Sequence, residues 1–84
     1  MQYDVVHVEP IGHLLLKVEF SDGTAGEVRF EETHLTGVFA ALKDREYFLR
    51  VNCANGFVEW PDDLDLAPDA MYDAVKESGV WVLS

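Results

Sequence analysis

A β-hairpin signal in the first third of the chain constrains the fold more than any other feature of the sequence. The dipeptide Asp22-Gly23 favours the positive φ angles of a type I′ turn, and it separates two segments in which apolar and polar residues alternate, His13–Phe20 and Ala25–Phe30. Because side chains point alternately to the two faces of a strand, the apolar residues of both segments fall on one face: Leu14, Leu16, Val18, Phe20, Val28 and Phe30. The pattern predicts two antiparallel strands whose apolar face must be covered by a second layer.

Two further segments of the first half fit this arrangement. Tyr3–Val8 is rich in β-branched residues and is predicted as a strand, closed by the turn residues Pro10-Ile11-Gly12. A short helix is predicted over Gly37–Lys43, with Thr33 or Thr36 as its cap. The apolar stripe of this helix has the i, i+3, i+4, i+7 spacing of a face that covers a sheet: Leu35, Val38, Phe39 and Leu42.

The second half predicts two more strands and a second helix. A charged turn over residues 44–47 leads to a strand over Phe48–Cys53, and an Asn55-Gly56 turn leads to a short strand over Phe57–Trp60 that a proline ends. After an acidic loop over residues 62–66, Pro68 suits the first turn of a helix and Gly79 its left-handed end. The buried face of this helix is predicted to carry Met71, Tyr72 and Val75.

These segments have the order β-β-β-α-β-β-α, which is an α+β two-layer sandwich with a mainly antiparallel sheet and two short helices. The length of 84 residues predicts a single domain over residues 1–84. The apolar segment Val80–Leu83, within the last residues 80–84, is either a sixth edge strand or a tail that docks on a neighbouring molecule. The sequence leaves these two alternatives open.

The charge of the chain argues against two classes of partner. Sixteen acidic and six basic residues give a net charge of −10, whereas binding to nucleic acid or to an anionic membrane depends on clustered Lys and Arg. No apolar run approaches the ~20 residues that a membrane span needs, and the N-terminus lacks the features of a signal peptide. The lone Cys53 cannot form an internal disulfide. We therefore expect a cytoplasmic protein whose acidic surface suits a basic protein partner.

A longer motif in the second half resembles the signature of a known family. Residues 58–72 combine an apolar strand, Trp60-Pro61, an Asp-rich stretch, Pro68 followed by an acidic residue, and the pair Met71-Tyr72. This run resembles the signature of a family of small bacterial domains of unknown function, number 2442 in that series. Two earlier stretches resemble the same family, Val18–Gly23 with its Asp-Gly turn and Phe39–Asp44 with its Phe-x-x-Leu-x-Asp pattern. The resemblance covers roughly residues 5–72.

The resemblance implies an α+β fold similar to the one derived above, with no established catalytic residues. Some members of that family continue into a helix-turn-helix DNA-binding domain, which has no counterpart in this sequence, so DNA binding is not expected. Genes of the family frequently neighbour the gene of a second small protein, in an arrangement similar to a toxin–antitoxin pair. The resemblance therefore implies that this chain is the acidic, antitoxin-like partner of a basic small protein.

Three aspartates of the acidic loop form a candidate site for a divalent cation, because hard cations take several oxygen ligands: Asp62, Asp63 and Asp65. Their spacing does not match an EF-hand loop, so the favoured interpretation is a solvated loop in which Asp65 accepts backbone N–H bonds near the start of the next helix. The histidines lack the spacing of metal ligands: His7, His13 and His34. No nucleophile has an evident base beside it, so no enzyme activity, catalytic residue or cofactor is predicted.

Three aromatic residues are candidates for a role in interaction. Trp60 and Tyr72 are interpreted first as core anchors that fasten the second helix to the sheet, and second, with the nearby aspartates, as an interface hot spot. Trp81 lies in the apolar C-terminal segment, where a dimer contact or a partner-docking strand competes with simple packing.

The sequence supports three hypotheses of function. The leading one is a non-catalytic protein-binding module that presents its acidic face to a basic partner. The second is a regulatory domain that senses a metal ion or small ligand at Asp62, Asp63 and Asp65. The third is a structural homo-oligomer formed through Val80–Leu83.

Overall fold

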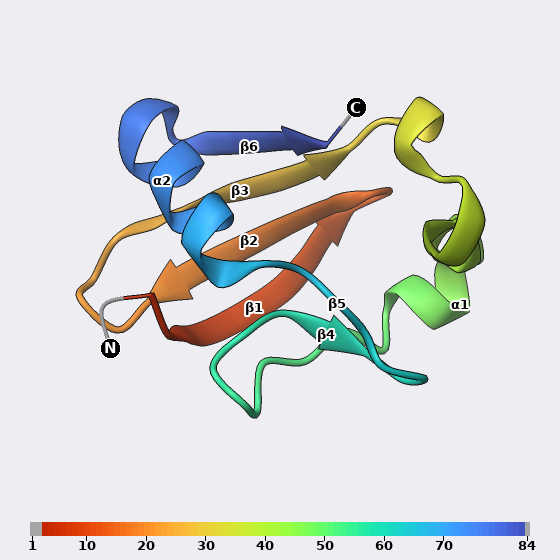
Figure 1. The fold of residues 1–84 in the computed structure, drawn as a ribbon, viewed down its shortest axis with the longest axis horizontal. Helices are drawn as coiled ribbons and strands as arrows, with labels where there is room; N and C mark the ends of the chain where they lie inside the picture. Colours follow the sequence, from red (N-terminus) through yellow and green to blue (C-terminus); the bar gives the residue numbers. More distant parts are fainter. Residues whose placement is uncertain (1–2, 84) are drawn as a thin grey trace.

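A four-stranded sheet with the order β1-β2-β3-β6 forms the larger layer of the protein (Figure 1). The computed structural model describes residues 3–83 and every side chain among them except that of Val38. The strands are β1 (Val5–Gly12), β2 (Leu15–Phe20), β3 (Ala25–Phe30) and β6 (Val80–Leu83). The first three pair antiparallel, whereas β6 runs parallel to β3. The C-terminal apolar segment is therefore an edge strand, and Ser84 lies outside the described residues.

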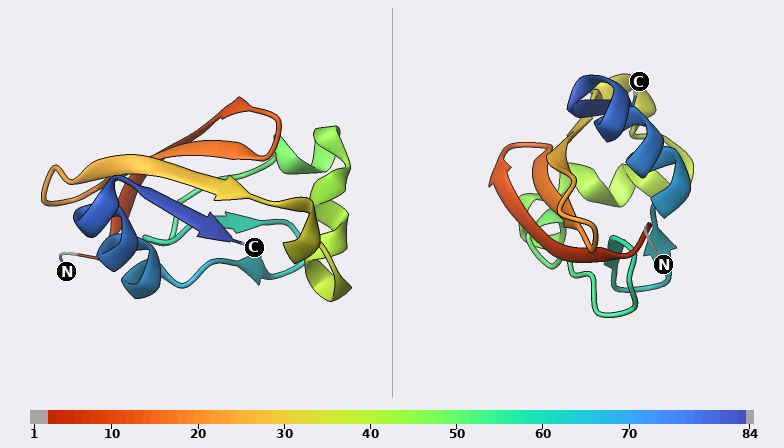
Figure 2. Two further views of the ribbon diagram at one scale, coloured as in Figure 1. Left: turned by 90° about the horizontal axis from the view of Figure 1, so that it is seen from above. Right: turned by 90° about the vertical axis from the view of Figure 1, so that its left-hand side faces the viewer.

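The smaller layer covers one face of this sheet. It contains β4 (Glu59–Trp60), β5 (Leu64–Asp65) and α2 (Pro68–Ser78), which lie together on one side of the main sheet (Figure 2). Three short helical turns close one end of both layers: η1 (Glu32–His34), η2 (Gly37–Lys43) and α1 (Arg45–Phe48). The predicted α+β class with a mainly antiparallel sheet and two helices is confirmed. Among residues 3–83, no helix is long and apolar enough to cross a membrane.

The hairpin between β2 and β3 forms where the Asp-Gly signal predicts it, but with another turn. Gly23 takes a positive φ of 89° and Asp22 does not, so the predicted type I′ turn is wrong. The amide of Gly23 donates to Phe20 O at 3.0 Å, and the amide of Phe20 donates to Thr24 O at 2.8 Å. This pattern is typical of a three-residue loop in which a left-handed glycine follows a type I turn. The Asp22 carboxylate favours it because Oδ1 accepts the Thr24 amide at 2.9 Å.

The first strand is longer than its sequence pattern predicts. Pro10-Ile11-Gly12 continues β1 instead of closing it, and the register with β2 shifts between Pro10 and Gly12. Proline is tolerated here because β1 is an edge strand and its pairing with β2 is irregular directly after Pro10. The irregularity leaves Ile11 between two paired residues, and this side chain is 45% exposed.

The predicted strand over Phe48–Cys53 is wrong. Asp44 begins a helix instead, since its carboxylate accepts the Glu46 amide at 3.0 Å, and α1 continues to Phe48. Asp at a helix N-cap outweighs the β-propensity of the residues that follow. Of the predicted strand only Asn52 makes a bridge, to Glu59, through two N–O hydrogen bonds of 2.9 Å.

Two other predicted elements differ in type. The first predicted helix has the expected bounds but is a 3₁₀-helix, and Thr36 occupies its N-cap without a side-chain hydrogen bond. Gly37 begins it with a φ of 58°, which is outside helical geometry. The acidic loop contains β5, because the residues after Asp63 pair back onto β4: Glu59 with Asp65 and Trp60 with Leu64.

The core forms where the two layers meet, and the predicted inward-facing residues of β2, β3 and α2 are buried in it. Trp60 lies near its centre at 2% exposure, with the rings of Phe30 and Phe48 each 6.0 Å away between centroids. Its indole Nε1 donates to Phe48 O at 2.9 Å, so the polar atom of this buried side chain is satisfied. Gly79 ends α2 at a φ of 82°, as predicted. Of the predicted helical stripe, Leu35 and Leu42 are buried and Phe39 is half-buried, while the side chain of Val38 lies outside the described part.

Candidate functional site

The acidic turn between β4 and β5 is the best-defined surface feature that the sequence predicts as a site. Asp62 and Asp63 take consecutive left-handed conformations, with φ angles of 70° and 64°. Aspartate adopts this region more readily than most residues, although at some cost in energy. The hydroxyl of Tyr47 donates to Pro61 O, which fastens the turn to α1. The backbone that carries the two exposed carboxylates is thereby fastened at the edge of the smaller layer.

A pocket of about 290 Å³ opens beside this turn. It is lined by apolar groups and by the two aspartates: Ala41, Tyr47, Asp62, Asp63 and Leu64. Desolvation, followed by the negative charge of Asp62, raises the pKa of the Tyr47 phenol, which therefore stays neutral and able to donate its proton. An apolar pocket with an acidic rim suits a side chain with a hydrocarbon stem and a cationic head.

The acidic turn does not form a metal cluster with its neighbours. Asp65 lies on β5 opposite Glu59, and Glu59 Oε2 accepts a hydrogen bond of 3.0 Å from Asn55 Nδ2. Within residues 3–83, no three His, Cys, Asp or Glu side chains lie close enough together to hold a metal ion. The predicted hydrogen bonds from backbone N–H groups near the start of α2 to the Asp65 side chain are wrong. The helix begins after Ala67 without a side-chain cap.

The three histidines lie apart. His7 Nε2 is 3.6 Å from Glu9 Oε1 on the exposed part of β1. His34 ends η1 and packs its ring against Phe39, with 4.8 Å between the centroids. His13 occupies the turn between β1 and β2 and lines a separate pocket.

Trp60 and Tyr72 are covered by the protein itself. Their side chains are 2% and 7% exposed, so neither offers a face to a partner in this conformation. The hot-spot interpretation of these two residues is therefore not supported, and both belong to the core. The three aspartates of the acidic loop are exposed on the surface: Asp62, Asp63 and Asp65.

Tyr72 has a polar partner that sequence reasoning missed. Its hydroxyl donates to Asp22 Oδ2 at 2.5 Å, which joins α2 to the β2–β3 hairpin. This hydrogen bond, with additional bonds from Thr24, lowers the pKa of Asp22 from 3.8 to about 2. Lys76 Nζ lies 3.5 Å from the Tyr72 hydroxyl and adds a favourable positive charge. Only the fold brings these residues together, because no spacing rule joins positions so far apart in the sequence.

The Asp22–Tyr72 contact predicts a loss of stability in acid. Because the pKa of Asp22 is lower in the folded state, its contribution is fully present above the unfolded value of 3.8 and is lost as the pH falls towards about 2. Replacing Tyr72 by phenylalanine should make the free energy of unfolding fall less steeply between pH 4 and pH 2. Denaturant titrations across this window measure the slope.

Tyr47→Phe is the matched control for that experiment, because its hydroxyl bonds to a carbonyl that does not titrate. The control should change stability equally at every pH in the window. If the free energy of unfolding of Tyr72→Phe falls between pH 4 and pH 2 as steeply as that of the unmodified protein, the contact does not set the pKa of Asp22.

Trp81 occupies the edge strand β6. It lies opposite Val28 in the parallel register and packs, half-buried, against the core. The amide of Glu31 donates to Leu83 O at 2.8 Å, so the end of β6 is also tied to the chain after β3. On the other face of the strand, Val82 is 41% exposed.

Cys53 lies half-buried beside the bridge that joins Asn52 to Glu59. Burial, with the negative charge of Glu59 as a second cause, raises the pKa of its thiol. The thiol is therefore mainly protonated at neutral pH, which is the less reactive form.

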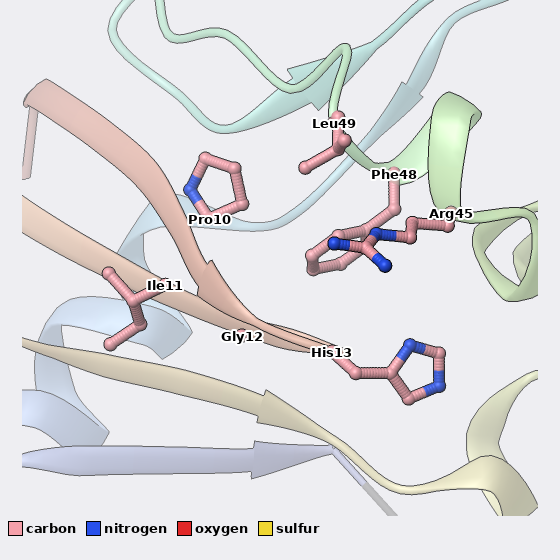
Figure 3. A pocket seen from close by; sticks show the side chains of 7 residues that line it. All are labelled: Pro10, Ile11, Gly12, His13, Arg45, Phe48 and Leu49. Atoms are coloured by element: carbon pink, nitrogen blue, oxygen red, sulfur yellow. The ribbon is translucent and has the colours of Figure 1, made fainter.

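A second and larger pocket, of about 580 Å³, opens between the β1–β2 turn and α1 (Figure 3). It is lined by residues from both segments: Pro10, Ile11, Gly12, His13, Arg45, Phe48 and Leu49. Sequence reasoning missed it, because residues 48–53 were assigned to a strand. The N-cap preference of Asp44 was the signal that could have placed Arg45 and Leu49 on a helical turn.

Comparison with known proteins identifies one family. A family described as a protein of unknown function (DUF2442) matches residues 5–77. No curated protein matches the sequence. No solved structure matches it either.

Proposed function

The chain belongs to the DUF2442 family of proteins of unknown function, and from this premise we propose that it is a non-catalytic protein-binding module. In this proposal it acts in the bacterial cytoplasm as the antitoxin-like partner of a small basic protein. The net charge of −10 favours association with a protein of opposite charge, by steering the encounter and by disfavouring other acidic proteins.

The acidic turn and its pocket are the observation that carries this proposal. A lysine or arginine of the partner would lay its hydrocarbon stem against Ala41 and Leu64 and direct its cationic head to Asp62 and Asp63. Two carboxylates beside a partly desolvated pocket contribute more than the same charges on an open surface, because solvent screens them less.

Co-expression with the product of the neighbouring gene tests the proposal. We expect a complex that survives purification at low salt and weakens as the salt concentration rises. The double change Asp62→Asn and Asp63→Asn should weaken the complex by about tenfold, since it removes both charges from the pocket rim. Asparagine also tolerates the left-handed backbone of the turn, so the fold should persist. Isothermal titration calorimetry of the purified partners measures the affinity.

Asp73→Asn with Glu77→Gln is the matched control, because it removes the same charge from the exposed face of α2. The control should weaken the complex much less than the change at the turn. The proposal fails if no complex forms at low salt. An equal effect of both double variants would refute the role of the pocket and leave only a general effect of charge.

The exposed edge of β6 favours a homo-oligomer through Val80–Leu83 as the second candidate. Unpaired strand edges are templates for pairing with another chain, and Val82 adds exposed apolar surface. Size-exclusion chromatography of the protein without its partner distinguishes the two candidates. An elution volume larger for Val82→Lys than for the unmodified protein would indicate oligomers formed through this edge.

A sensor of metal ions or small ligands at Asp62, Asp63 and Asp65 has weaker support, since these carboxylates form no cluster in residues 3–83.

A further inference from the structure

We propose that the pocket between the β1–β2 turn and α1 binds a small carboxylic acid with an apolar body. This inference concerns a different face from the acidic turn and does not depend on the proposed protein partner. It follows from three properties of the pocket: an arginine without an ion pair, an apolar lining that is left exposed, and the absence of carboxylates from its walls.

Arg45 is the residue on which the proposal depends most. It lies at the pocket wall on α1, and among residues 3–83 its guanidinium makes no ion pair and no hydrogen bond to a side chain. Both neighbours of Arg45 in the sequence are acidic, Asp44 and Glu46, and Asp44 directs Oδ1 to the amide of Glu46 at 3.0 Å. Arg45 is exposed and, like the other Lys and Arg side chains of residues 3–83, has no ion pair; its position at the pocket is what makes its charge available to an anion that enters there.

The walls of the pocket determine what kind of anion fits. None of its seven lining residues is acidic, and His13 from the β1–β2 turn lines the pocket on the same side as Arg45 (Figure 3). Its imidazole supplies a second N–H donor for an oxygen of the ligand. Such a pair of donors suits the two oxygens of a carboxylate, which arginine binds in a planar, bidentate geometry.

The rest of the pocket is apolar and accessible. Ile11 and Leu49 are 45% and 52% exposed, although both are large hydrophobic side chains. Phe48 lies beside them at 3% exposure, and Pro10 completes the apolar side. A hydrocarbon group would cover these side chains and remove them from water. The volume of about 580 Å³ lies within the range of small-ligand sites. A phosphate or sulfate alone would leave this apolar side uncovered, so an aliphatic or monoaromatic acid fits better.

Hexanoate is the probe for the test, and backbone amide NMR of the full chain locates its binding. We expect saturable shifts confined to the amides of residues 11–13 and 45–49. Hexanamide has the same hydrocarbon without the charge, and acetate has the charge without the hydrocarbon, so both should bind at least about tenfold more weakly. Arg45→Gln should weaken hexanoate binding by about tenfold or more. Arg50→Gln, at an exposed arginine outside the pocket, should leave it unchanged.

Several results would overturn the proposal. One is the absence of saturable shifts with hexanoate, and another is a set of shifts centred elsewhere on the protein. A third is that Arg45→Gln, shown to be folded by its amide spectrum, binds hexanoate as tightly as the unmodified protein. A pentapeptide with a C-terminal leucine carboxylate tests the other source of the same chemistry. If the peptide binds at these residues and hexanoate does not, the ligand is a chain terminus and the small acid is refuted.

Discussion

Replacing Trp60 by alanine is expected to lower the free energy of unfolding by about 3–5 kcal/mol, the usual cost of truncating a buried aromatic side chain. Trp60 is 2% exposed and contacts the rings of Phe30 and Phe48 at the meeting point of both layers. A domain of this size is stable by roughly 5–10 kcal/mol, so the variant should be close to unfolded at room temperature. Urea denaturation followed by circular dichroism measures the difference.

Trp60→Phe separates the loss of volume from the loss of the hydrogen bond. It retains a ring but removes the Nε1 donor at 2.9 Å, which leaves Phe48 O with only the longer bond of 3.4 Å from the Val51 amide. We expect a cost of about 1–3 kcal/mol for this variant, because the loss of the shorter hydrogen bond to a buried acceptor adds to a smaller cavity. A cost below about 1 kcal/mol for Trp60→Ala would contradict the central place given to this residue.

Gly26→Ala is expected to lower the free energy of unfolding by about 3 kcal/mol, the upper part of the range for overpacking. A Cβ atom at Gly26 would lie 2.5 Å from Gly79 O and 2.6 Å from Val75 Cγ1. Gly79 O is a backbone atom at the end of α2. The same oxygen accepts a hydrogen bond of 3.0 Å from the Glu27 amide. Relief of the clash would therefore move the end of α2 and the start of β6 together. Thermal and urea denaturation measure the cost.

Gly12→Ala is the matched control within the same sheet. Its Cβ would meet only Leu15, at 3.8 Å, and the backbone there is not left-handed. The change in stability should be within about 0.5 kcal/mol. If both glycine variants had the same stability, the close approach of α2 to β3 would not be a real constraint on the fold.

The parts of the fold that sequence alone predicts are those with local causes. Alternation fixes the inward faces of β2 and β3, because the strands are adjacent and joined by a short loop. The start and end of α2 are predicted correctly from Pro68 and Gly79, because each residue acts through its own backbone geometry. The strand predicted over Phe48–Cys53 failed for a similar local reason, since the cap at Asp44 was not recognised.

What could not be predicted depends on contacts between distant segments. Nothing in the apolar pattern of Val80–Leu83 says that it pairs with β3, or that it does so in parallel. The same holds for the candidate sites. Asp62 and Asp63 were identified from composition, but their pocket requires Tyr47 and Ala41 from elsewhere in the chain. Arg45 and His13 line one pocket because the fold places the β1–β2 turn beside α1, although the two residues are far apart in the sequence.

The parallel pairing of β3 with β6 has a consequence for synthesis of the protein on the ribosome. The edge of β3 that faces β6 is made before η1, η2, α1, β4, β5 and α2, whereas β6 follows all of these elements, so that edge stays open while they emerge. Contacts between segments so distant in sequence form slowly, because the long loop must close before they contribute. The nascent hairpin therefore offers an unpaired edge to neighbouring unfinished chains until β6 pairs with β3.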